Sequence, residues 1–129
     1  MFKGLQMNKI LLSLLLLGAT HFINANEEAK ALVEKKCSEC HMIDSMTDNK
    51  KDNGKLKAPP MWGVMRKIRE HFKTEDEVMA FVKDYTFNPS EEKMIFPKAT
   101  MEYFGLMPSL KAELNEEELH TIAKYLLSI

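Results

Sequence analysis

Apolar residues in the middle of the chain recur at helical spacing. Their positions, at i, i+3, i+4, i+7 and i+11, are Met61, Val64, Met65, Ile68 and Phe72. This period places them on one face of a helix, while Arg66, Lys67 and Arg69 fall on the other side. Pro59 and Pro60 precede the run, and proline suits the first position of a helix. The pattern therefore predicts an amphipathic helix directly after the two prolines.

Two later helices are marked by capping residues as well as by apolar spacing. Thr74 and Glu77 form a capping-box pattern, and Asn115 and Glu118 repeat it near the C-terminus. Each box is followed by apolar positions at i, i+3, i+4 and i+7. These positions are Val78, Phe81, Val82 and Tyr85 after the first box, and Leu119, Ile122, Ala123 and Leu126 after the second.

The remaining segments are predicted to be helices and loops, so the chain as a whole is expected to be all-α. Residues 27–36 are rich in Ala, Glu and Lys, which favour a helix. Residues 44–57 are polar and are predicted to form a solvated loop. The Asn-Pro-Ser sequence at 88–90 ends one helix, and a short helix is expected to follow through Met94. Residues 97–108 are predicted to be irregular, and no segment shows a convincing strand pattern.

The first 25 residues have the layout of a secretory signal peptide. Two lysines precede the apolar run 10–19, and a short polar stretch ends at Ala25. A membrane-spanning helix needs about 20 apolar residues, whereas this run is shorter and is ended by Thr20 and His21. We therefore expect cleavage after Ala25, which leaves residues 26–129 as one exported domain. An uncleaved membrane anchor is the alternative.

Composition narrows the class of protein. The chain has 129 residues, and its 18 Lys and Arg nearly balance its 19 Asp and Glu. The resulting net charge of -1 argues against a nucleic-acid binder, which would show a basic excess. A hydrophobic content of 45% is typical of a globular protein and not of a disordered one. Its 2 Cys are too few for a disulfide-dense scaffold, whereas its 10 Met are unusually many.

The two cysteines carry the most specific chemical signal. Cys37, Cys40 and His41 form the Cys-x-x-Cys-His signature of c-type haem attachment. Thiols three residues apart on a helical turn can reach the two vinyl groups of one haem. The imidazole next to the second thiol then falls under the iron. The signature therefore predicts one covalently bound haem c, with His41 as an iron ligand.

Two other roles for the cysteines fit the sequence less well. A redox-active disulfide would occur on a thioredoxin-like βαβ background, and that pattern is absent from the sequence. A zinc site needs about four ligands, so the pair would have to recruit the distant His71 or His120. Together with the export signal, these points favour haem.

A methionine is the candidate for the other axial position of the iron. A thioether ligand raises the reduction potential of a haem relative to a second imidazole. Most methionines of the chain lie at helical positions and are expected to pack in the core. Met107 differs, because Gly105 before it lets the backbone approach a flat ring and Pro108 after it stiffens the chain. Met107 is therefore the predicted ligand, with Met101, His71 or an open site as alternatives.

These motifs together resemble a class I c-type cytochrome. The matching segments, in the order of the family, are Cys37-Ser-Glu-Cys40-His41, Ala58-Pro59-Pro60-Met61-Trp62-Gly63, Gly105-Leu-Met107-Pro108 and Ile122-Ala-Lys-Tyr125-Leu. The resemblance covers nearly all of residues 27–129. It implies an all-α fold of about four to five helices wrapped around one covalently bound haem.

The resemblance also implies a role for individual residues. His41 would be the proximal ligand and Met107 the distal ligand. The carbonyl of Pro59 would accept a hydrogen bond from the other N–H of His41 and fix its ring. The first and last helices would cross at close range, with Ile122 and Tyr125 against the first helix.

The predicted site favours electron transfer over catalysis. With protein ligands at both axial positions, the iron has no place for a substrate, peroxide or oxygen. The expected function is a soluble mono-haem carrier of one electron, exported to the periplasm. Its expected partners are periplasmic or membrane redox enzymes, with no nucleic acid and no stable membrane insertion after cleavage. The alternatives are a dedicated subunit of an oxidase or dehydrogenase, and a haem-based ligand sensor with an open sixth position.

Charge adds a hypothesis about docking. Cations flank the proline pair at Lys50, Lys51, Lys55, Lys57, Arg66, Lys67 and Arg69. These residues either belong to ordinary solvated faces, or form a basic face that steers the protein towards acidic partners.

Overall fold

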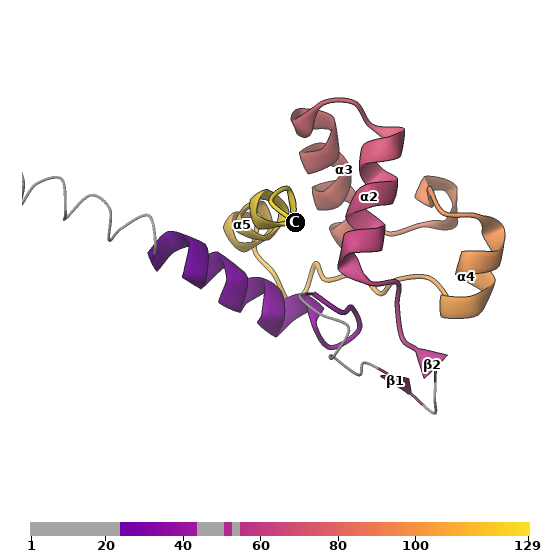
Figure 1. Cartoon of the computed structure of the whole chain (residues 1–129). Helices are drawn as coiled ribbons and strands as arrows, with labels where there is room; N and C mark the ends of the chain where they lie inside the picture. The colour runs from indigo at the N-terminus through magenta and orange to yellow at the C-terminus, as the bar shows by residue number, and fades with distance from the viewer. Residues whose placement is uncertain (1–23, 44–50, 53–54) are drawn as a thin grey trace, which may run out of the picture.

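The computed structural model describes residues 24–43, 51–52 and 55–129 (Figure 1). The described part of the first helix covers residues 24–37. The later elements are strands β1 (Lys51–Asp52) and β2 (Lys55–Leu56), helices α2 (Met61–His71) and α3 (Glu75–Phe87), the 3-10 helix η1 (Glu91–Lys93), and helices α4 (Lys98–Phe104) and α5 (Glu116–Leu126). The predicted all-α class, with four to five helices, is confirmed.

The segment predicted as a polar loop contains a minimal hairpin. β1 and β2 are two residues each and pair antiparallel, with Lys51 opposite Leu56 and Asp52 opposite Lys55. No strand was expected here, because two residues are too short to show an alternating pattern. The hairpin adds a backbone ladder to the loop without changing the class of the fold.

The two predicted capping boxes are both present. The Thr74 hydroxyl accepts from the Glu77 backbone N–H, and the Glu77 carboxylate accepts in return from the Thr74 N–H. Asn115 and Glu118 make the same reciprocal pair at the start of α5. Each box satisfies N–H groups that a helix start would leave without a partner. The residue pattern therefore sets where α3 and α5 begin.

The predicted apolar faces form one core. Buried positions from α2, α3 and α5 gather with Val33 of the first helix and with Ile43 and Leu114 from the connections. The α2, α3 and α5 members are Met61, Met65, Ile68, Val78, Val82, Leu119, Ile122, Ala123 and Leu126. All four positions predicted for the buried face of the last helix are buried. The core therefore follows the apolar period of the sequence.

The prediction that residues 97–108 are irregular is wrong for residues 98–104, which form α4. Lys98, Ala99, Met101 and Glu102 are good helix formers, which accounts for the turn of helix here. Pro97 precedes α4 and Gly105 follows it, with a φ of 79°. A helix of seven residues is too short to show an apolar repeat, so the sequence pattern did not reveal it.

The first helix and α5 lie next to each other, as the resemblance implied. Val33 shares the buried cluster with Leu119 and Ile122, and the Lys36 ammonium donates to the Glu113 carbonyl across 2.8 Å. Figure 1 shows α5 between the first helix and α3, with α2 beside α3 and α4 at the far side. The C-terminal end of the first helix therefore faces α2, α3 and the segment before α5.

Arg69 joins α2 to the end of the last helix. Its guanidinium donates to the carbonyls of Leu126 and Leu127, at 3.4 and 2.8 Å. These carbonyls have no partner within the helix, and a cation there also suits the negative end of the helix dipole. Arg69 therefore fixes the C-terminal end of α5 against α2.

Candidate functional site

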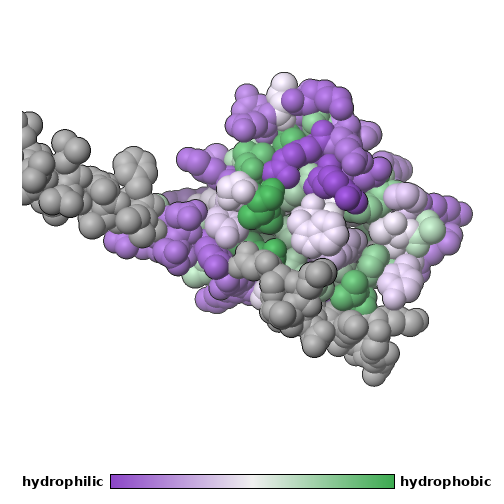
Figure 2. Space-filling view, viewed as in Figure 1, coloured by the Kyte–Doolittle hydropathy of each residue, from purple (hydrophilic) through white to green (hydrophobic). Residues whose placement is uncertain are grey.

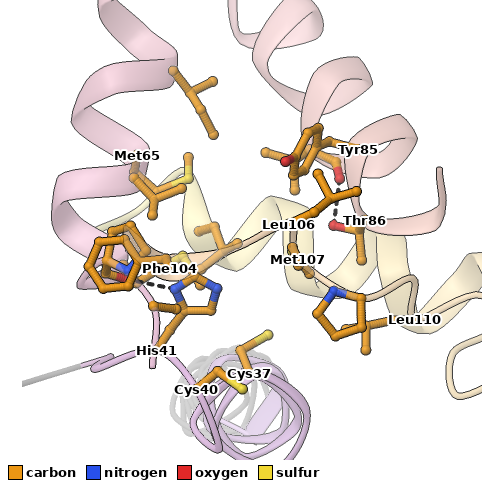
Figure 3. A pocket seen from close by; sticks show the side chains of 18 of the residues that line it. Cys37, Cys40, His41, Met65, Tyr85, Thr86, Phe104, Leu106, Met107 and Leu110 are labelled. Carbon is orange, nitrogen blue, oxygen red and sulfur yellow. Dashed lines mark hydrogen bonds between the residues drawn. The ribbon is translucent and has the colours of Figure 1, made fainter. Parts of the chain in front are cut away.

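The predicted haem-attachment residues lie on one continuous turn at the end of the first helix. Cys37 is the last helical residue, and its carbonyl accepts from the N–H groups of Cys40 and His41 at 3.3 and 3.0 Å. These bonds continue the winding of the chain for one more turn. Figure 3 shows the three side chains on the same side of the cavity. The spacing of the signature therefore produces the shared direction that the sequence predicted.

His41 is fixed by the carbonyl of Pro59. Its Nδ1 lies 2.7 Å from the Pro59 oxygen (Figure 3), and the Met61 N–H donates to the Met42 carbonyl across 2.8 Å. These two contacts join the chain after the cysteines to the start of α2. The position of the His41 ring is therefore set by the proline pair, which matches the contact that the resemblance implied.

The chemistry of this contact fixes the state of the imidazole. A carbonyl oxygen only accepts, so Nδ1 carries the proton and the lone pair belongs to Nε2. Burial lowers the pKa of His41, against the opposing effect of the Pro59 hydrogen bond. Burial and the Pro59 carbonyl together favour a neutral imidazole with its lone pair on Nε2, which is the form that binds a metal ion.

The Cys37 thiol lies in surroundings that do not suit a redox-active cysteine. Cys37 and Cys40 are both free and half-buried. Burial raises the pKa of the Cys37 thiol to about 11. A redox-active pair needs the opposite, a thiol whose pKa is lowered by nearby positive charge. The surroundings of Cys37 therefore do not favour the dithiol alternative.

A cavity of about 410 Å³ lies in front of these residues. Its walls come from the end of the first helix, residues 57–59, α2, α3, residues 94–96, residues 104–110 and α5. Most of the lining is apolar, and charged residues from the first helix and the loops contribute Lys36, Glu39, Lys57 and Glu113. The volume lies in the range of cofactor and small-molecule sites. The helices thus enclose a cofactor-sized apolar space that the cysteines and His41 enter from one side.

Met107 lines the same cavity as His41. It is half-buried and belongs to the segment between α4 and α5 (Figure 3). Gly105 turns the chain out of α4 with a φ of 79° and a ψ of 179°, a conformation open essentially to glycine. Neither of the alternatives Met101 and His71 is among the residues that line the cavity. Met107 is therefore the better placed of the three, and its ligation stays a prediction.

Met94 is a cavity residue that the sequence did not single out. It follows η1, lines the cavity and accepts a hydrogen bond at its sulfur from the Tyr85 hydroxyl, at 3.9 Å. Burial raises the pKa of Tyr85, so its hydroxyl stays protonated. No glycine or proline directly adjoins Met94, and it has no helical repeat, so only the packing of η1 on α3 reveals it.

The residues of the cavity fit a covalently held haem. The Cys37 and Cys40 thiols and the free Nε2 of His41 face an apolar space, and thioethers line its walls. Such a set suits a flat apolar ring with an iron at its centre. Within residues 24–43, 51–52 and 55–129, no three His, Cys, Asp or Glu side chains gather into a metal-binding group. In the same part of the chain, no helix has the length and hydropathy needed to cross a membrane.

Comparison with known proteins gives two matches and one negative result. The sequence model of the cytochrome c family matches residues 26–129. A protein of Aquifex aeolicus (strain VF5), described as uncharacterized, is 30% identical over 131 residues, which cover 93% of this chain and 86% of the relative. No solved structure matches the chain.

Proposed function

The chain belongs to the cytochrome c family, as a class I c-type cytochrome with covalently bound haem c, and we propose that it is a mono-haem carrier of one electron in the periplasm. The observation that carries the proposal is the cavity into which the Nε2 of His41 opens and which Met107 also lines. Two protein side chains are thus available for the two axial positions of one iron.

Each residue of the site has a task in this proposal. Bound haem c supplies an iron that accepts and releases one electron. Cys37 and Cys40 hold the group by thioether bonds, and His41 offers an imidazole whose orientation Pro59 fixes. Met107 offers the second ligand, which raises the potential relative to a second imidazole. The mostly apolar walls hold few polar groups that would reorient when the charge of the iron changes.

The same ligand set argues against catalysis. A substrate, peroxide or oxygen molecule needs an open position on the iron, and His41 with Met107 would leave none. We therefore propose that the protein transfers electrons and is not an enzyme. Optical spectra and carbon monoxide binding of the purified protein test this. We expect a c-type spectrum, an iron–sulfur charge-transfer band when oxidised, and slow binding of carbon monoxide when reduced. Fast binding would instead select the ligand sensor.

The distal position can be tested with a histidine at residue 107. Met107→His is expected to abolish the iron–sulfur band and lower the reduction potential, because imidazole binds the iron more strongly than a thioether. Met101→His is the matched control, since Met101 belongs to α4 but does not line the cavity. A band that disappears in Met101→His and survives in Met107→His would contradict the assignment of Met107.

Export is the part of the proposal that rests on the N-terminal sequence. The predicted signal peptide, residues 1–25, lies outside the described residues apart from Asn24 and Ala25, which belong to the first helix. In an exported protein, this segment would be either cleaved off as a signal peptide or kept as a membrane anchor. N-terminal sequencing of the mature protein is expected to begin at Asn26. An intact N-terminus in a membrane fraction would select the uncleaved anchor.

A second candidate function is a dedicated subunit of a redox enzyme. Three large apolar side chains are well exposed, Trp62 at 52%, Tyr103 at 56% and Leu106 at 44%. Leu106 also lines the cavity, so part of this apolar surface lies where a partner would approach the haem. Stable co-purification with an oxidase or dehydrogenase would select this function over a free carrier.

A further inference from the structure

Met94 places a second thioether next to Tyr85 on the cavity wall. Its side chain is half-buried, and the Tyr85 hydroxyl donates to its sulfur across 3.9 Å. Thioether sulfur is a weak acceptor, so the contact orients the side chain more than it stabilises the fold. A sulfur has two lone pairs, and the hydrogen bond uses one of them. The other remains free to bind a metal ion.

Tyr85 shows on which side of the cavity this sulfur lies. Figure 3 shows Tyr85, Leu106 and Met107 across the cavity from the His41 ring, with Cys37 and Cys40 below them. An axial ligand that faces His41 through the plane of a haem must come from the Tyr85 side. Met94, held by Tyr85, and Met107, next to Leu106, both meet this condition.

Contacts to α3 hold Met94 in this position. The Lys93 ammonium lies 2.8 Å from the Asp84 carboxylate and donates to the Asn88 carbonyl across 3.0 Å. The Met94 N–H donates to the Glu91 carbonyl across 3.2 Å. These contacts fix η1 to the end of α3, directly before Met94. Its place on the wall therefore results from packing that does not involve Met107.

The other methionines of the cavity are less suited to bind the iron. Met61 and Met65 are exposed by only 6% and 0%, and their backbone belongs to α2. Because α2 starts two residues after Pro59, which holds His41, it is joined to the His41 side of the cavity. Met101 does not line the cavity. Among the methionines that line the cavity, Met94 therefore remains as the candidate beside Met107.

We propose that Met94 is a second thioether ligand of the haem iron, which binds opposite His41 when Met107 is displaced or removed. The iron would then keep one histidine and one methionine ligand in either arrangement. The inference rests on the proposed function only in placing haem c in this cavity. It adds that removal of the Met107 side chain does not leave an open coordination position on the iron.

Four holoprotein variants test the proposal. They are Met107→Ala, Met94→Leu, the double variant Met107→Ala/Met94→Leu, and the control Met107→Ala/Met101→Leu. The readouts are the iron–sulfur band of the oxidised protein and the rate of carbon monoxide binding by the reduced protein. We expect the band to persist in Met107→Ala, in Met94→Leu and in the control. We expect its loss, together with fast carbon monoxide binding, in the double variant alone.

Other outcomes of this series overturn the inference. Loss of the band in Met107→Ala shows that Met94 does not reach the iron, and loss in the Met101 control shows that Met101 was the substitute. Circular dichroism and the c-type spectrum check that each variant folds and carries haem. If Met107→Ala does not accumulate, Met107→Leu keeps the side-chain volume and answers the same question. Absence of a c-type spectrum from the native protein would defeat the proposed function itself, which is a separate result.

Discussion

At the residue scale, Gly105 and Gly63 differ in whether the backbone needs a glycine at that position. Gly105 ends α4 with a φ of 79° and leads the chain towards Met107. Gly63 lies inside the first turn of α2. A methyl group added at either position would meet no atom within 4 Å. With respect to protein atoms, the two positions therefore differ in backbone conformation and not in free space.

Alanine substitutions at these positions should change stability in opposite directions. Gly105→Ala is expected to lower the free energy of unfolding by about 1–3 kcal/mol, because its φ and ψ are essentially restricted to glycine. Gly63→Ala is expected to raise it by up to about 1 kcal/mol, since alanine favours a helix. Urea unfolding of the holoprotein, followed by circular dichroism, measures both. Equal effects of the two substitutions would contradict this explanation.

At the scale of elements, the start of α3 depends on a carboxylate. The backbone N–H groups of Thr74 and Lys73 both donate to Glu77 across 3.0 Å. The Thr74 bond is the main cause, and the Lys73 bond the second, of a lowered pKa for Glu77. Both bonds favour the charged carboxylate, as does the positive end of the helix dipole. The stability of this helix start is therefore linked to pH.

The sign of this linkage can be measured. The pKa of Glu77 is lower in the folded protein than its ordinary value of 4.5, so the unfolded chain takes up the proton first on acidification. The stabilisation is present above pH 4.5 and is lost as the pH falls through the lower, folded value. Thermal unfolding of the wild type should show this loss. Glu77→Gln keeps a capping side chain but cannot titrate, so it should weaken the dependence. An unchanged profile would exclude Glu77 as the source.

The sequence predicted the elements whose signal is local and missed those that depend on packing. Both capping boxes, the apolar faces and the direction of Cys37, Cys40 and His41 follow from residue types at fixed spacing. The helix α4 is too short to carry a period, and it was predicted as irregular. Met94 has no motif around it, and its position comes from contacts of η1 with α3. Tertiary contacts of this kind leave no pattern within one segment.

At the scale of the whole molecule, the structure describes only part of the predicted basic docking face. Lys50 lies outside the described residues, and only the backbones of Lys51 and Lys55 are described. On α2, Glu70 pairs with both Arg66 and Lys67, at 3.9 and 3.4 Å. Figure 2 shows apolar residues in the middle of one face, between hydrophilic surfaces of the first helix and of the turn between α2 and α3. On α2 the pairing with Glu70 favours ordinary solvated charges, and the docking face and the partners stay predictions.

The effect of salt on electron transfer tests this interpretation. Reduction of an anionic reagent such as hexacyanoferrate(III) by the holoprotein should not become slower when salt is added. Residues 26–129 hold 16 Lys and Arg against 19 Asp and Glu, and this net charge of -3 offers no overall attraction for an anion. Glu70→Gln removes the anion between Arg66 and Lys67, so it should shift the response towards slowing. Stopped-flow kinetics at several salt concentrations measure both. A wild-type rate that falls clearly with salt would restore the basic docking face.

The two contacts that join His41 and Met42 to Pro59 and Met61 have a consequence for engineering. They join the two ends of the chain between Met42 and Pro59, and they hold the predicted iron ligand His41 at the start of α2. Closure entropy grows slowly with length, and doubling such a segment costs only about 0.6 kcal/mol. A reporter peptide or an electrode-binding sequence inserted in that interval should therefore leave the ligand geometry intact. The segment is a natural place to attach this cytochrome to a surface while the haem site stays as it is.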